Sequence, residues 1–163
     1  MSGTASAPGS VRSIVGLGRR CFDWLNEIPY ALLAIPLRFA VATVFWNSAT
    51  THLANWQATM YLFETDYRLP FLAPHPAAYL AVAIEVSTPV LLILGLLTRI
   101  SSGILLGMTA VIEIFVYPQA WPTHIQWAAM LLVLLVRGPG RLSLDWFIRR
   151  WLVDRSWKRN RGG

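Results

Sequence analysis

Three charged residues lie inside long apolar segments of the chain, where a charge needs a chemical or structural reason. They are Arg38, Glu85 and Glu113. A charged side chain costs about 2.5 kcal/mol or more in the hydrocarbon of a membrane. At about 1.5 Å per residue, Arg38 lies about 12 Å from one end of its segment and Glu85 about 12 Å from the opposite end of its own. In a core of about 30 Å their depths then differ by only about 6 Å, so we predict an intramembrane ion pair.

Two interpretations of this pair are open. It can be structural, fixing how the first two helices dock while adding little net stability. It can also form a polar ligand pocket that grips a lipid headgroup, a quinone oxygen or a proton. Both interpretations place Arg38 and Glu85 side by side.

Glu113 belongs to a polar stripe on the third apolar segment. The members of this stripe lie within about 40° of one direction around a helix and are Ser102, Thr109, Glu113 and Tyr117. Polar faces of membrane helices turn toward the protein interior, so we expect this face to look into a bundle. The alternative is hydrogen bonding between helices by the hydroxyl groups, with Glu113 pointing outward.

The histidines lie at or beyond the outer ends of the apolar segments. Imidazole and carboxylate are ligands that suit zinc and copper, so His52, Glu113 and His124 form a candidate metal set. Their spacing gives no local metal signature such as HxxxH. The alternative is that these histidines are amphipathic residues at a wet boundary.

The composition predicts an integral membrane protein. Of its 163 residues, 55% are hydrophobic and only 13% are charged, and the mean hydropathy is +0.49. Such values exclude a disordered chain and argue against a soluble enzyme. Four segments approach the length of about 20 apolar residues that a spanning helix needs: about 30–49, 77–97, 101–117 and 123–136. The last is short, and a buried re-entrant segment is its alternative.

The basic residues predict the topology. The chain has 14 Lys and Arg against 8 Asp and Glu. Three precede the first span, Arg99 lies at the turn between the second and third, and eight follow Val136, which is 12 of the 14. Basic residues gather on the cytoplasmic side, so we expect both termini in the cytoplasm. This pattern excludes a nucleic-acid partner and favours anionic lipid headgroups at the basic termini. A protein partner docked on the tail is the alternative.

We therefore expect an all-α, four-helix transmembrane bundle with interfacial amphipathic helices at the termini and in the first outer loop. Residues 1–20 would be a flexible cytoplasmic arm, 21–153 the membrane domain, and 154–163 a basic cytoplasmic tail. Apolar faces mark the interfacial helices: Cys21, Trp24, Leu25 and Ile28; Trp56, Met60 and Phe63; and Leu144, Phe147, Ile148, Trp151 and Leu152. Cys21 is the only cysteine, so the chain has no intramolecular disulfide.

Two short motifs give a family resemblance. GLLTR follows the second apolar segment at residues 95–99, and GPGRLSLD follows the fourth at residues 138–145. With the first helix, LRFAVATVFWNSATTHL, these elements resemble the DoxX family over residues 36–146. The resemblance implies a four-helix protein of the bacterial inner membrane, with Arg38 and Glu85 at the family's polar positions. By position, Arg99 and Asp145 match the family's cytoplasmic motif residues. We expect them to be anchors, Arg99 at a tight turn, and Ser143 with Asp145 as a cap for the tail helix.

Two hypotheses for the function follow. The first is a redox-associated accessory subunit that binds quinone, quinol or a similar small ligand near Arg38 and Glu85 and needs a partner for catalysis. The second is a non-enzymatic protein that handles a metal or solute, or holds a partner, at the outer face through His52, Glu113 and His124. Whether the chain is an enzyme is left open.

Overall fold

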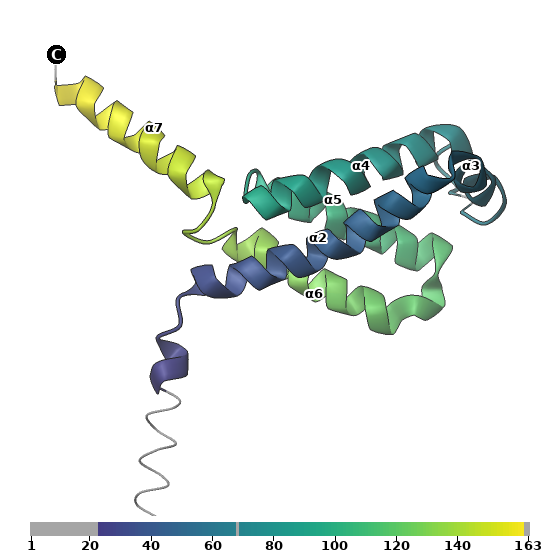
Figure 1. Ribbon diagram of the computed structural model, residues 1–163, viewed down its shortest axis with the longest axis horizontal. Helices are drawn as coiled ribbons and strands as arrows, with labels where there is room; N and C mark the ends of the chain where they lie inside the picture. Colours follow the sequence, from purple (N-terminus) through teal and green to yellow (C-terminus); the bar gives the residue numbers. More distant parts are fainter. Residues whose placement is uncertain (1–22, 68, 162–163) are drawn as a thin grey trace, which may run out of the picture. The chain divides into compact units, whose positions relative to one another are not determined.

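The computed structural model describes residues 23–67 and 69–161. Contacts divide the chain into two units, residues 1–30 and residues 31–163, and the helical bundle belongs to the second unit. Every regular element in the described residues is helical, which confirms the predicted all-α class (Figure 1). The elements are α2 (Tyr30–Ala54), α3 (Trp56–Thr65), α4 (Pro74–Leu94), α5 (Thr98–Val111), the π-helix η1 (Ile112–Val116), the short 3-10 helix η2 (Pro118–Ala120), α6 (Trp121–Arg137) and α7 (Leu144–Arg161).

Four helices share one apolar core. Its fully buried side chains come from α2, α4, α5 and α6 and are Val41, Ala42, Phe45, Leu92, Leu105, Leu131 and Leu134. Large apolar side chains also cover the outside of these helices, whereas Arg38, Glu85, Ser102 and Thr109 are buried. This arrangement, apolar outside and polar inside, suits helices surrounded by lipid.

Three helical segments are long and apolar enough to cross a membrane. They are Tyr30–Ala54, Pro74–Leu94 and Thr98–Val116, and they correspond to the first three predicted spans. The fourth predicted span corresponds to α6, which has 17 residues. At 1.5 Å per residue α6 is about 26 Å long, slightly less than a hydrocarbon core of about 30 Å, so a count of four spans stays a prediction.

The end of the bundle at which α4 stops and α5 begins is called here the Gly95 end, and the opposite end the His52 end. Gly95 ends α4 with a φ of +66°, and Leu96 N donates to Leu91 O, as in a Schellman cap. Leu97 follows with a φ of +50° and begins α5 without a side-chain cap of its own. The missing cap comes from Asp145, whose carboxylate accepts from Leu97 N at 2.8 Å and from Thr98 N at 3.0 Å.

The prediction that Asp145 caps the tail helix was therefore wrong, because its carboxylate caps α5 instead. Ser143 does cap α7, since its Oγ accepts from Trp146 N at 3.3 Å. Arg99 donates from Nη2 to Val136 O at 3.1 Å and so joins the start of α5 to the end of α6. The two family-like motifs thus meet at the Gly95 end as a network that closes helix termini.

α7 begins directly after this network. It runs without a break from Leu144 to Arg161, so the predicted start of the tail at residue 154 falls inside a helix. The apolar residues predicted for its face are all exposed, from Leu144 to Leu152. Trp24 and Leu25 of the other predicted interfacial stretch are exposed as well, and Cys21 lies outside the described residues.

The predicted amphipathic stretch in the first loop is α3. Asn55 begins it, its side-chain oxygen accepting from Ala58 N at 3.0 Å. Phe63 is buried in a second apolar cluster with Ala77 and Ala78 of α4, and Trp56 and Met60 pack against it. This cluster holds α3 and the loop after it against the His52 end of α4.

Gly95 offers a test of the network. A Cβ at this position would lie 2.6 Å from Ser143 Cβ and would also clash with the Arg38 guanidinium. The positive φ adds strain for any L residue. We expect Gly95→Ala to lower the free energy of unfolding by about 2 kcal/mol, measured as a lower thermal midpoint in detergent.

Gly107→Ala is the matched control for that substitution. Gly107 lies inside α5, where no positive φ is recorded, and a Cβ there would meet nothing within 4 Å. Because alanine favours helices over glycine, this variant should be as stable as the parent chain or more so. Equal stability of the two variants would contradict the account of the Gly95 end.

Candidate functional site

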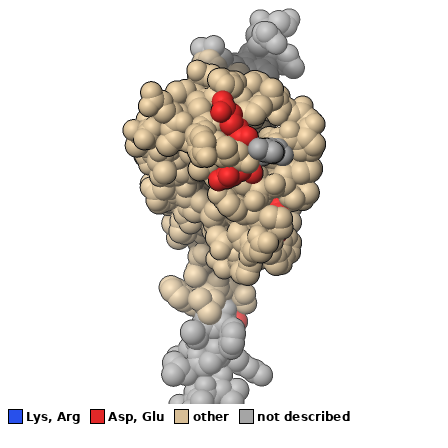
Figure 2. Space-filling model, turned by 90° about the vertical axis from the view of Figure 1, so that its right-hand side faces the viewer, with Lys and Arg blue, Asp and Glu red and all other residues tan. Residues whose placement is uncertain are grey.

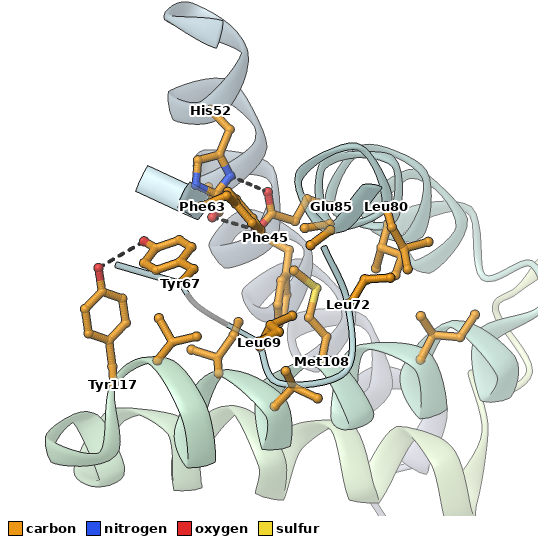
Figure 3. Close-up of a pocket in the computed structure, with 18 of the residues that line it drawn as sticks. Phe45, His52, Phe63, Tyr67, Leu69, Leu72, Leu80, Glu85, Met108 and Tyr117 are labelled. Carbon is orange, nitrogen blue, oxygen red and sulfur yellow. Dashed lines mark hydrogen bonds and ion pairs between the residues drawn. The ribbon is translucent and has the colours of Figure 1, made fainter. Parts of the chain in front are cut away.

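The polar centre of the molecule is Glu85, near the middle of α4. Its side chain is 3% exposed. Both carboxylate oxygens are bound by α2: Ser48 Oγ donates to Oε1 at 2.9 Å, and His52 Nδ1 lies 2.8 Å from Oε2 (Figure 3). Ser48 and His52 are four residues apart and so share a face of α2. One helix face therefore binds the whole carboxyl group.

The His52–Glu85 contact can hold a proton in more than one way. A proton on Nδ1 is donated to the carboxylate, and a proton on the carboxyl group can be donated to Nδ1. Because Glu85 occupies Nδ1, Nε2 is the ring atom left to act on a ligand. Neutral imidazole accepts there and imidazolium donates, so the pair can change its hydrogen-bonding character by one proton.

The predicted ion pair between Arg38 and Glu85 was wrong. Arg38 reaches the Gly95 end, where Nη2 donates to Leu142 O at 3.0 Å, while Glu85 lies ten residues before Gly95, about 15 Å along the helix. Side chains on a helix lean toward its N-terminus. α2 and α4 run in opposite directions, so two residues at similar depth lean apart. The prediction considered only the depths of the two residues in the membrane and not the direction in which their side chains lean.

A second histidine–carboxylate pair lies at the same end of the bundle. His124 Nδ1 is 2.6 Å from Glu113 Oε2, and the His124 side chain is 6% exposed. His124 belongs to the first turn of α6 and its ring lies 5.0 Å from that of Trp127. Glu113 lies in η1, so this pair joins the π-helix to α6.

The predicted metal set is not assembled. The structure places Glu113 with His124 and pairs His52 with Glu85 instead. Among the residues that the structure describes, no group of three or more His, Cys, Asp or Glu side chains could hold a metal ion. Residue types suggest possible metal ligands, but they do not give the distances between side chains on three separate helices.

The predicted polar stripe divides at the π-helix. Ser102 and Thr109 are buried in the bundle as expected. A π-helix has more residues per turn than an α-helix, so it rotates the chain on its C-terminal side about the helix axis. Glu113 is only partly buried, and Tyr117, just beyond η1, is 45% exposed.

A cavity of about 390 Å³ connects these features. Its wall is formed by α2, α3, α4, α5, η1, α6 and the loop between α3 and α4, and it is mostly aliphatic and aromatic. Such a volume is typical of sites for small organic ligands. The lining residues with hydroxyl, imidazole or carboxyl groups are Ser48, His52, Tyr67, Glu85, Tyr117 and His124.

Two tyrosines close part of the His52 end. The Tyr67 and Tyr117 hydroxyl oxygens are 2.9 Å apart, and the Tyr67 ring packs edge-on against Phe63 (Figure 3). Burial raises the pKa of the Tyr67 phenol well above its usual range, and the hydrogen bond to Tyr117 adds to this shift. The Tyr67 hydroxyl is therefore held in its protonated form, and it is hydrogen-bonded to Tyr117.

Sequence reasoning missed Ser48 and Tyr67. Ser48 carried a usable signal, its spacing of four residues from His52 on a helix that must bury any polar group. Tyr67 carried none, because it lies in an irregular segment whose path depends on α3 docking against α4.

Comparison with known protein families gives one match. The DoxX family profile matches residues 33–118, which include the His52–Glu85 pair. A Haemophilus influenzae protein named "Uncharacterized protein" is 30% identical over 136 residues, covering 74% of this chain and 86% of that protein. No solved structure matches the chain. With its apolar helices, these matches indicate a multi-pass membrane protein, and the chain belongs to the DoxX family.

Proposed function

We propose that this protein binds a quinone, a quinol or a similar small lipid-soluble molecule in the cavity, with the polar group of the ligand at His52 and Glu85. The observation that supports this most is the position of the buried pair. It forms a polar point in the wall of a cavity that is otherwise mainly apolar. Sites of this composition use a few polar groups to orient a largely apolar ligand.

The chemistry of the pair suits this ligand class. A quinone oxygen accepts hydrogen bonds, and a quinol hydroxyl donates one. His52 Nε2 can do either, according to its protonation. Phe45, Phe63 and Trp127 line the same cavity and offer apolar surface to a ring.

We further propose a redox-associated accessory role. Oxidation of a quinol releases protons, and the His52–Glu85 pair is a group that can accept one. The chain has a single cysteine and so cannot form a disulfide relay of its own. In this account the protein holds and orients the ligand, while a partner in the membrane exchanges electrons with it.

The topology that we propose places the Gly95 end at the cytoplasm of a bacterial inner membrane, with four spans. Arg99, Arg137 and Arg141 lie at or beside the helix termini of that end. The view of the His52 end shows acidic side chains and, among the described residues, no Lys or Arg in sight (Figure 2). Cytoplasmic basic residues and their attraction to anionic lipid favour this orientation.

Thiol labelling tests the topology. In a Cys21→Ser background, Gln57→Cys on α3 should react with a membrane-impermeant maleimide in intact cells. Arg149→Cys on α7 should react only after the membrane is permeabilised. Labelling of the Arg149→Cys variant in intact cells would contradict a fourth span or the cytoplasmic C-terminus.

Substitution of Glu85 tests the binding site. Glu85→Gln keeps the size of the side chain but removes the carboxylate that holds His52. We expect affinity for a short-tailed benzoquinone to fall about tenfold, equal to about 1.4 kcal/mol. Calorimetric titration in nanodiscs measures this, and the thermal midpoint of each variant shows whether it is folded.

The control for this experiment is a similar pair elsewhere. His75 and Glu64 are 3.1 Å apart at the same end of the bundle, but their side chains are 68% and 48% exposed. Glu64→Gln should leave the affinity unchanged. If Glu85→Gln and Glu64→Gln both bind the benzoquinone like the parent protein, the proposed site is wrong.

A further inference from the structure

We infer that the ligand reaches the cavity sideways from the hydrocarbon of the bilayer, between α4 and α5, and that its class is a polar head on a long apolar tail. This inference rests on the proposed function and deepens it. It specifies the route of the ligand and the part of the molecule that stays outside. The observation that supports it most is which of the residues lining the cavity reach the protein surface.

Most of the cavity wall is buried or half-buried, and only four lining residues are exposed. These are Phe71 at 62%, Leu80 at 55%, Ile104 at 43% and Tyr117 at 45%. Three of the four are purely apolar. A cavity entered from water would be expected to open among polar side chains, whereas this one reaches the surface mainly through hydrocarbon groups.

The apolar opening follows two neighbouring helices. Leu80 and Ile84 are one turn apart on α4, and Ile104 and Met108 are one turn apart on α5. Each pair therefore forms a stripe along its helix. Both helices belong to segments that can cross a membrane, so the opening between the stripes lies at a depth where lipid tails are the surroundings.

The surface around the opening has the same character. Ile100, one turn before Ile104 on α5, is 59% exposed but does not line the cavity. A ligand that enters between Leu80 and Ile104 leaves lipid and meets apolar side chains until it reaches Glu85, so it needs no passage through water.

At the His52 end, where the lining residues Phe71 and Tyr117 also reach the surface, contacts hold the loop after α3 over the cavity. The loop after α3 places Leu69 and Leu72 over the cavity, and Tyr67 is hydrogen-bonded to Tyr117 beside them (Figure 3). Phe71 packs edge-on against Phe115 at a ring distance of 5.6 Å. These contacts join the loop to η1 and cover the polar groups from the aqueous side.

The geometry assigns each part of the ligand a place. The head reaches His52 and Glu85, whose polar atoms form the inner wall. The tail leaves between Leu80 and Ile104 and remains among lipid chains. A molecule without a tail would lose this second contact, so tail length becomes a determinant of binding that the polar pair alone would not create.

Photo-crosslinking in nanodiscs tests the route. The probe is a benzoquinone with a ten-carbon tail that ends in a diazirine, and peptide mapping locates the labelled residues. We expect labels on α4 and α5 near Leu80 and Ile104. Excess benzoquinone with an unmodified ten-carbon tail should suppress them at least fivefold.

A blocking variant and its control sharpen the result. Ile104→Trp should fill the opening and reduce the suppressible labelling at least fivefold. Ile100→Trp adds the same group one turn away on the same helix, outside the cavity wall, and should leave labelling unchanged. Because both sites are exposed, neither variant should disturb the core, and equal thermal midpoints will verify this.

The other outcomes separate the two proposals. Suppressible labels on α3 or on residues 69–73 would overturn the lateral route and leave ligand binding intact. Equal labelling of both tryptophan variants would also overturn the route. The absence of any suppressible label in the parent protein would overturn the route and the proposed function together.

Discussion

Glu85 places a carboxyl group in the apolar middle of α4, where its burial costs free energy. The hydrogen bonds that offset this free energy determine much of the arrangement around Glu85. Ser48 and His52 bind both of its oxygens, so one face of α2 is held to α4 at this point. Removing either partner would leave a buried polar group partly unsatisfied, which is costly in a low-dielectric interior. The same bonds place the imidazole at the wall of the cavity. The hydrogen bonds that stabilise the buried Glu85 therefore also position the imidazole that a ligand would contact.

The two ends of the bundle divide structural and chemical roles. At the Gly95 end, Asp145 caps α5, Arg99 joins α5 to α6, and Arg38 binds the carbonyl of Leu142. These contacts satisfy helix termini in a place where glycines bring chain segments close together. The His52 end instead carries the two histidine–carboxylate pairs and the tyrosine pair. Arg38 and His52, both on α2, thus act about 21 Å apart, given their spacing of 14 residues.

The helices could largely be predicted from the sequence, because apolar segments of this length form few structures other than helices. Ser143 as a helix cap and Arg99 as an anchor at a turn followed from local spacing. The Arg38–Glu85 pair was wrong because depth was considered without the direction in which side chains lean on antiparallel helices. The role of Asp145 could not be derived locally, since the amides that it caps lie 47 and 48 residues earlier. The metal set failed for a similar reason, and the π-helix at 112–116 shifted the second half of the polar stripe.

If a lipid-soluble ligand occupies the cavity beside His52 and Glu85, native mass spectrometry of the protein in nanodiscs cut from its own membrane will detect it. We expect a retained mass that matches a quinone or another tailed lipid-soluble molecule, and loss of that mass in the Glu85→Gln protein. Release of an empty chain from native membranes, with the parent protein and the Glu85→Gln variant giving identical spectra, would contradict it.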